Sequence, residues 1–149
     1  MKVLGVDPGV SGAYALLSAG GVATVDDLPV VGNQINAGEW KRILAQLTPD
    51  TAVVEKVHSM PGQGVASTFR FGMACGLIQG VLLGAGVPVI DVTPNVWKKY
   101  FGLNNDGERS RALACRRFPS LAGLARKKDH NRAEALLIAL WKLETDDPV

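Results

Sequence analysis

The chain begins with a short apolar run, Val3 to Val6, that ends on a single carboxylate, Asp7. Pro8 and Gly9 then turn the backbone, and a second apolar run occupies residues 13–17. Short apolar runs bounded by turn residues predict buried β-strands. An aspartate at a strand end is usually a turn former, because its side chain hydrogen-bonds its own backbone two residues further on. Asp7 alone therefore indicates a turn, and any further role depends on other acids.

The composition predicts one ordinary globular domain. The chain has 149 residues, 47% of them apolar and 20% charged, which is enough to bury a core without crosslinks. Cys75 and Cys115 lack the spacing of a zinc site and indicate reduced cysteines. The N-terminal residues do not have the pattern of a signal peptide. We therefore expect a single cytoplasmic domain over residues 1–149, with a tail at 143–149 that frays.

Apolar periodicity and turn residues predict an α/β fold. The expected strands span 3–7, 13–17, 22–28, 51–55 and 87–92, and the expected helices span 38–47, 67–85, 94–100, 106–118 and 131–143. The strand at 51–55 is almost continuously apolar, which indicates a sheet covered on both faces by helices.

Residues 73–90 carry no charge and form a stretch long enough to span a bilayer. The stretch is interrupted by glycines and by Pro88, so we predict a core helix followed by a strand of a soluble domain. Glycines recur every fourth residue at 72, 76, 80 and 84 and line one helix face. That face either packs against the sheet or forms a dimer interface.

Basic residues are concentrated in the last third of the chain. Between Trp97 and Arg132 only three acids accompany ten lysines and arginines. A basic surface of this kind suits a polyanion, because neutralised phosphates release their counterions. The alternative is a solvated surface without a partner.

Further acids are placed where the fold could bring them to Asp7. Glu55 ends a strand as Asp7 does, and the last helix begins with the segment 129–134, Asp-His-Asn-Arg-Ala-Glu. Positions 130 and 134 share a helix face. Grouped carboxylates are stable only with a cation, and hard oxygen ligands suit Mg²⁺ or Mn²⁺. Metal-assisted phosphodiester hydrolysis is the natural chemistry, whereas the alternatives are a surface acid for Glu134 and an N-cap for Asp129.

Four motifs occur in order at 5–9, 53–57, 93–98 and 132–139. Together this set resembles the RuvC family of Holliday-junction resolvases, and the segment 61–72 is similar to the phage and prophage branch of that family. The resemblance implies an RNase H-like fold with a five-stranded mixed sheet flanked by helices. It also implies a homodimeric, Mg²⁺-dependent endonuclease for four-way DNA junctions in recombination, repair or phage DNA processing, with four metal-binding positions.

The resemblance assigns these positions unequally. Asp7 and Glu55 match directly, and Glu134 stands where the family more often has Asp. The family places an Asp or His three or four residues before the final acid, which selects Asn131 or His130. We expect Asp129, five residues before Glu134, as the fourth ligand. His130 is the other contender, since a neutral histidine would ligate Mn²⁺ or orient water in catalysis, and Asn131 is the weakest ligand of the three.

The resemblance also implies DNA contacts. Family members place a stacking residue in the loop after the second acid, where this chain offers His58, Met60 and Gln63. The expected phosphate contacts are Lys56, Lys98, Lys99, Arg109, Arg111 and Lys128.

Three alternatives to a junction resolvase remain open at this stage. The first is a nuclease with broader specificity for flaps and forks, and the second is a junction-binding protein without catalysis. A sugar-kinase-like half-domain would need a second domain and a further phosphate loop.

Overall fold

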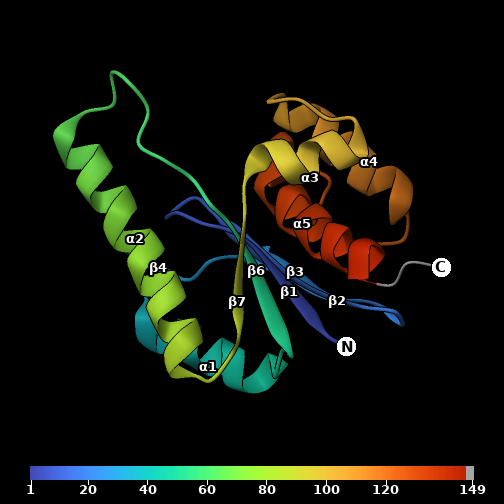
Figure 1. Ribbon diagram of the computed structural model, residues 1–149, viewed down its shortest axis with the longest axis horizontal. Helices are drawn as coiled ribbons and strands as arrows, with labels where there is room; N and C mark the ends of the chain where they lie inside the picture. Colours follow the sequence, from blue (N-terminus) through green and yellow to red (C-terminus); the bar gives the residue numbers. More distant parts are fainter. Residues whose placement is uncertain (147–149) are drawn as a thin grey trace.

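The computed structural model describes residues 1–146 and contains a five-stranded mixed sheet in the order β3-β2-β1-β6-β7 (Figure 1). Its strands are β1 (Val3–Asp7), β2 (Ala13–Ser18), β3 (Gly21–Asp27), β6 (Thr51–Glu55) and β7 (Val89–Val92). Neighbouring strands are antiparallel among β1, β2 and β3 and parallel among β1, β6 and β7. The predicted five-stranded α/β fold is confirmed.

The register brings the two strand-end acids together. Val6 pairs with Val54 in the parallel β1–β6 ladder, so Asp7 and Glu55 end neighbouring strands at the same sheet edge. Side chains alternate between the faces of a strand. Asp7 therefore shares a sheet face with Val3, and Glu55 shares that face with Val53.

Helix α5 (His130–Asp146) covers that face, together with α3 (Pro94–Phe101) and α4 (Gly107–Arg117) (Figure 1). The contact between α5 and β1 requires glycine at position 5. A Cβ there would lie 2.0 Å from the carbonyl oxygen of Ala135 and 2.8 Å from the backbone nitrogen of Ala139. This close approach brings the first turns of α5 to the strand ends.

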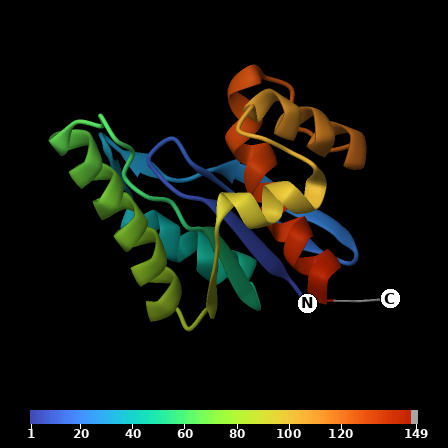
Figure 2. The same ribbon diagram turned by 45° about the horizontal axis from the view of Figure 1, so that its top comes forward.

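Helices α1 (Ala37–Leu47) and α2 (Val65–Gly84) cover the opposite face (Figure 2). Trp40 is fully buried between them, and its indole nitrogen donates a 3.2 Å hydrogen bond to the carbonyl of Ile78. The sheet thus has one hydrophobic core on each of its faces.

Helix α2 differs from the core helix that the sequence predicts. Only Ala74, Ile78 and Leu82 are buried, and a Cβ at Gly72, Gly76, Gly80 or Gly84 would meet nothing within 4 Å. The glycine face therefore does not pack on the sheet. By length and composition α2 is also long and apolar enough to cross a membrane, but helices of soluble proteins pass the same test.

Three further details differ from the sequence expectations. A short hairpin, β4 (Val30–Val31) and β5 (Gln34–Ile35), and a 3₁₀ turn, η1 (Lys127–Asp129), were not predicted. Helix α5 continues to Asp146, so residues 143–146 are helical instead of frayed. Residues 147–149 of the expected tail lie outside the described part of the chain.

Candidate active site

Three carboxylates from three elements meet at the carboxyl edge of the sheet. Asp7 and Glu55 end β1 and β6, and Glu134 lies in the first turns of α5. Their side chains are buried, with exposed fractions of 9%, 7% and 9%. Buried acids are costly unless they are paired or coordinate a metal, so this cluster is the main functional candidate.

Hydrogen bonds from neighbouring helices hold two of these carboxylates in place. The indole nitrogen of Trp97 donates a 2.7 Å bond to Glu55 Oε2, and Ser110 Oγ donates a 3.2 Å bond to Glu134 Oε1. Both donors are fully buried. Lys98 Nζ lies 3.8 Å from Glu134 Oε1 and 5.3 Å from the centre of the Trp97 ring. Helix α3 thus contributes an orienting donor and a cation.

The cluster is electrostatically undercompensated. Burial raises the pKa of Asp7 well above its usual range, and Glu55 and Glu134 raise it further while Lys98 lowers it. Burial also raises the pKa of Glu55, against the lowering effect of the Trp97 hydrogen bond. Titratable groups with strongly shifted pKa values concentrate at functional sites. Among the described residues, Lys98 is the one cation that lowers the pKa of both Asp7 and Glu55.

The donor set fits a hard divalent cation. Mg²⁺ binds through one or two carboxylates, keeps several waters and shares its remaining positions with phosphate oxygens. Mutually repelling, partly hydrogen-bonded carboxylates supply such ligands. Within residues 1–146, no three His, Cys, Asp or Glu side chains are close enough to enclose an ion by themselves. An ion held by Asp7, Glu55 and Glu134 would complete its coordination with water or phosphate oxygens.

Asp129, the expected fourth ligand, does not join this cluster. Its carboxylate accepts a 2.8 Å bond from the backbone nitrogen of Arg126 and another 2.8 Å bond from that residue's guanidinium. Arg132 lies 3.8 Å away. The hydrogen bond from the Arg126 side chain is the main reason why the pKa of Asp129 is lowered. Asp129 is the last residue of the 3₁₀ turn before α5 and completes a capping box with Arg126, which is the N-cap of that turn.

Of the next two residues, Asn131 lies beside Asp7 and His130 packs on the start of α4. The side-chain nitrogen of Asn131 donates a 2.7 Å bond to the carbonyl of Ser11, and Asn131 lines the same 190 Å³ pocket as Asp7. His130 packs against Gly107, where a Cβ would lie 2.8 Å from Nδ1. That nitrogen is buried and has no hydrogen-bond partner within residues 1–146. Of the three candidates, Asn131 is therefore the residue beside Asp7.

The expected DNA contacts fall into two groups. Lys56, His58 and Met60 are exposed around the loop after β6, and Lys99, Arg109 and Lys128 are exposed on the α3–α5 side. Arg111 is different, because its guanidinium bonds Glu108 and the carbonyls of Leu124 and Ala125. These bonds hold the Arg111 side chain to the protein, and its expected phosphate contact stays a prediction.

Sequence reasoning missed the two orienting donors. Trp97 lies inside the motif at 93–98, but nothing in that motif indicates that its indole is the partner of Glu55. Ser110 has no sequence signal, because its role depends on how α4 crosses α5. Both are visible only when the helices are placed.

Comparisons with known proteins agree with this fold. No family model matches the chain. It is 38% identical over 110 residues to the crossover junction endodeoxyribonuclease RuvC of Nitratidesulfovibrio vulgaris, strain Hildenborough. That alignment covers 66% of this chain and 65% of the relative, just under two thirds of its length. The RuvC of Chloroflexus aggregans is 29% identical over an alignment that covers 94% of this chain and 91% of the relative.

Solved structures define the fold. Thermus thermophilus RuvC in complex with a Holliday junction substrate superposes with a TM-score of 0.72 at 18% identity, covering 95% of this chain and 91% of that one. The Fowlpox virus resolvase, solved with Holliday junction DNA, gives a TM-score of 0.64 at 18% identity and covers 96% of this chain and 99% of that one. The protein thus has the RNase H-like fold of these nucleases.

The sequence relatives add to the likeness in fold. The chain is a homologue of the RuvC resolvases, which confirms the resemblance seen in its motifs. Its likeness to the phage branch stays a prediction.

Proposed function

We propose that this protein is a metal-dependent endodeoxyribonuclease that cuts four-way DNA junctions. The observation that carries the proposal is the undercompensated cluster of Asp7, Glu55 and Glu134 at the sheet edge of a RuvC homologue. Such a substrate would place the protein in the cytoplasm of a bacterial or phage-infected cell, and it agrees with the basic residues on the α3–α5 side.

Asp7, Glu55 and Glu134 would hold the metal, with the side-chain oxygen of Asn131 as a neutral fourth ligand. Mg²⁺ is the expected ion and Mn²⁺ a substitute, since both accept hard oxygen ligands. When bound, such an ion activates water and stabilises the leaving oxygen of a phosphodiester. Replacing a fourth carboxylate by Asn131 lowers the negative charge of the site, which favours approach of a phosphate.

The surrounding side chains orient the site. Trp97 fixes one oxygen of Glu55 and Ser110 fixes one oxygen of Glu134, so neither carboxylate turns freely. Lys98 reaches the cluster from α3 and is half-buried. We assign to Lys98 the attraction of the scissile phosphate, because it is the cation nearest to the three acids.

A homodimer fits both the substrate and the surface of α2. A four-way junction has two-fold symmetry, and two protomers related by a two-fold axis would present two equivalent sites. The open face formed by Gly72, Gly76, Gly80 and Gly84 allows another backbone to approach closely. Replacing Gly76 by Phe should yield a folded monomer in light scattering; an unchanged dimer would exclude this face.

The function is tested by incubating labelled four-way, forked and linear DNA with Mg²⁺ or Mn²⁺. The proposal predicts symmetric nicks in four-way junctions by the wild type and none by the variant Asp7→Asn. Asp50→Asn is the matched control, since Asp50 is a surface residue that accepts a hydrogen bond from Lys2 and precedes the far end of β6. Efficient cutting of forks and flaps would instead favour a broader nuclease.

A protein that binds junctions but cuts no branched DNA with either metal would contradict the proposal. That result would favour a binding protein that lost catalysis through its Asn131. The control for this outcome is Asn131→Asp, which restores a fourth acid beside Asp7.

A further inference from the structure

Arg132 opens the motif at 132–139 and has no role in the site described above. It lies in the first turn of α5, and its side chain is 14% exposed. Its Nε donates a 2.8 Å hydrogen bond to Asp27 Oδ1, and its Nη1 donates a 3.2 Å bond to the carbonyl of Gly123. A third bond of 3.4 Å joins Nη2 to Asp26 Oδ1. Arg132 thus connects the start of α5 to the end of β3 and to the loop before η1.

The bond to Asp27 lies in the same row of the sheet as Asp7. Asp7 pairs with Ala13 in the β1–β2 ladder, and Ala13 pairs with Asp27 in the β2–β3 ladder. Directly paired residues place their side chains on the same face of a sheet. Asp27 therefore lies on the α5 face, two strands or about 10 Å from Asp7. Arg132 fixes α5 against the row of residues that carries this proposed ligand.

Arg132 and the proposed ligand Glu134 lie on opposite sides of α5. Successive residues of an α-helix are rotated by about 100°, so the two side chains are about 200° apart around the helix axis. Asn131, the residue before Arg132, donates its 2.7 Å bond to the carbonyl of Ser11 in the β1–β2 turn. Two neighbouring residues thus bind the first turn of α5 to two different strand ends, which fixes its rotation.

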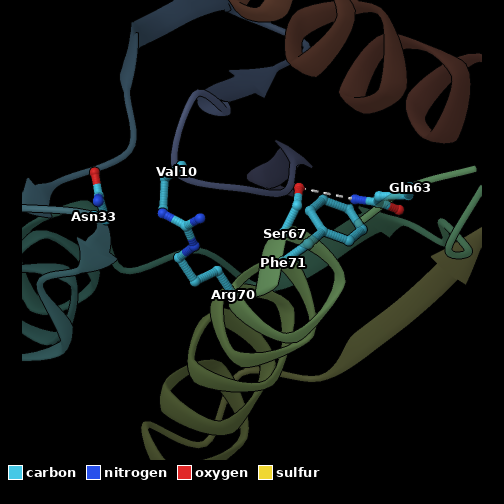
Figure 3. Close-up of a pocket in the computed structure, with 6 residues that line it drawn as sticks. All are labelled: Val10, Asn33, Gln63, Ser67, Arg70 and Phe71. Carbon is cyan, nitrogen blue, oxygen red and sulfur yellow. Dashed lines mark hydrogen bonds between the residues drawn. The ribbon is translucent and has the colours of Figure 1, made fainter. Parts of the chain in front are cut away.

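The α2 side of the site makes no such contact with α5. A 280 Å³ pocket opens there, between the β1–β2 turn, the β4–β5 hairpin and the first turns of α2 (Figure 3). It is lined by Val10, Asn33, Gln63, Ser67, Arg70 and Phe71. Within residues 1–146 none of these side chains hydrogen-bonds α5, and Gln63 bonds the backbone of Met60 and the hydroxyl of Ser67 instead. The bonds of Arg132 and Asn131 are therefore the polar contacts that hold the first turn.

Packing in the core is the alternative explanation for the position of this turn. From Ala133 to Ala139 every residue except Glu134 is fully buried, so the core holds the body of α5. Residues 130–132 come before this buried run and are only partly buried. Their position therefore depends on polar contacts more than on packing.

We propose that Arg132 is a positioning residue, which holds Asn131 and Glu134 where they can bind a metal together with Asp7. This inference rests on the proposed function. Arg132 acts through the backbone of the first turn and touches neither metal nor substrate. A planar guanidinium suits this role, because it reaches several acceptors at once in a fixed geometry. A misplacement of about 1 Å costs about 10²-fold in rate, so a small rotation of the turn would suffice to impair cleavage.

The test compares Arg132→Gln, Arg132→Lys and Asp27→Ala with the wild type. Arg132→Gln should slow single-turnover cleavage of a four-way junction at saturating protein by about 10²-fold. Without DNA, it should weaken Mn²⁺ binding by about tenfold, measured by electron paramagnetic resonance of the free ion. Its affinity for the junction in EDTA should not change, because the guanidinium bonds protein groups. Arg132→Lys keeps the charge beside Asp27 but not the fork that also reaches Gly123, so it should restore part of both losses.

Asp27→Ala removes the 2.8 Å bond from the other side and keeps Arg132 itself. It should lower cleavage and Mn²⁺ affinity in the same direction, and the double variant Asp27→Ala, Arg132→Gln should be no worse than Arg132→Gln alone, since both changes remove one interaction. If Arg132→Gln does not fold, Asp27→Ala carries the test. Arg126→Gln is the matched control, because the Arg126 side chain hydrogen-bonds only Asp129 among residues 1–146. It should keep wild-type Mn²⁺ affinity and cleavage.

Two results would overturn the proposal. Wild-type Mn²⁺ affinity and cleavage in folded Arg132→Gln, even with a lowered Tm, would show that core packing alone positions the turn. A loss of junction affinity in EDTA with unchanged cleavage at saturating protein would show that Arg132 is a phosphate contact. A wild type that cuts no branched DNA would instead contradict the proposed function, and Mn²⁺ affinity would still test the positioning.

Discussion

Asp129, in the 3₁₀ turn before α5, and Asp7, at the end of β1, are both buried, but their electrostatic surroundings are opposite. Asp129 is 2% exposed and is hydrogen-bonded to Arg126, so the pKa of its carboxyl is lowered. Asp7 is 9% exposed and faces Glu55 and Glu134, so its pKa is raised. The difference teaches that burial of an acid does not define a site. A buried acid without a counter-charge does indicate a site, because the fold then carries an unfavourable charge that a metal would neutralise.

The largest expected effect comes from removing one charge of the undercompensated cluster. Replacing Glu55 by Gln keeps the side-chain shape and the oxygen that Trp97 bonds but removes a metal ligand. We expect junction cleavage to fall by about 10³-fold or more, in line with losses of essential groups in other enzymes. Single-turnover cleavage with saturating protein measures the effect. A loss below tenfold would remove Glu55 from the site.

The next effect concerns the donor that orients Glu134. Replacing Ser110 by Ala removes the Ser110 Oγ bond to Glu134 and should reduce metal affinity or cleavage by about 10- to 100-fold. The cleavage rate as a function of Mn²⁺ concentration separates a loss of metal affinity from a loss of the cleavage rate at saturating metal. Ser18→Ala is the matched control, because Ser18 lies at the end of β2 outside the cluster. Equal behaviour of both variants would show that Glu134 needs no orientation.

The paired carboxylate, Asp129, should contribute to the free energy of unfolding. Asp129→Asn removes the charge that Arg126 pairs, and should destabilise the protein by about 1 kcal/mol, a small value because Arg126 is half exposed to solvent. The lowered pKa means that this stabilisation is present above about pH 4, the unfolded value, and is lost as the pH falls through the folded pKa. Denaturant titrations at neutral and acidic pH measure it. Cleavage should change less than threefold. A loss of cleavage with unchanged stability would show that Asp129 acts in catalysis and not in stabilising the fold.

The carboxylate without a sufficient counter-charge, Asp7, should have the opposite effect on the stability of the protein. The raised pKa of Asp7 means that its ionised form destabilises the metal-free fold above that pKa. Asp7→Asn should therefore raise the Tm without metal by about 2–4 °C, the shift of about 1 kcal/mol in a domain of this size. The gain should vanish as the pH falls toward about 3.9, the unfolded value. Calorimetry in EDTA tests this, and a lowered Tm at neutral pH would show that Asp7 is compensated.

Much of the architecture could be predicted from the sequence, because its signals are local. The strands 3–7 and 51–55 match the structure to the residue, since each is a short apolar run between turn residues. The proximity of Asp7 and Glu55 follows directly from these strands, because neighbouring parallel strands end at the same edge of a sheet. The hairpin at 30–35 carries the signal of a Gly-Asn turn between apolar residues, but its two-residue strands are too short for periodicity to reveal.

The features that the sequence does not predict depend on contacts between residues of different helices and turns. Asp129 was expected to bind metal because it lies near Glu134 in the chain. Its arginines at positions 126 and 132 lie three residues before and after it, and the 3₁₀ turn brings the first of them onto it. Helix α2 has apolar residues on all sides, a pattern that predicts burial. What packs against such a helix is not encoded in the pattern, and within one chain its glycine face is open.

The most direct test of the central claim is the affinity for Mn²⁺ of the wild type, Asp7→Asn and Asp129→Asn, measured by electron paramagnetic resonance of the free ion. The wild type should bind Mn²⁺ more tightly as the pH rises, because metal and protons compete for the carboxylates whose pKa values are raised. Asp129→Asn should bind with wild-type affinity, and Asp7→Asn should lose at least about tenfold in affinity. Loss of Mn²⁺ binding in Asp129→Asn but not in Asp7→Asn would contradict the account.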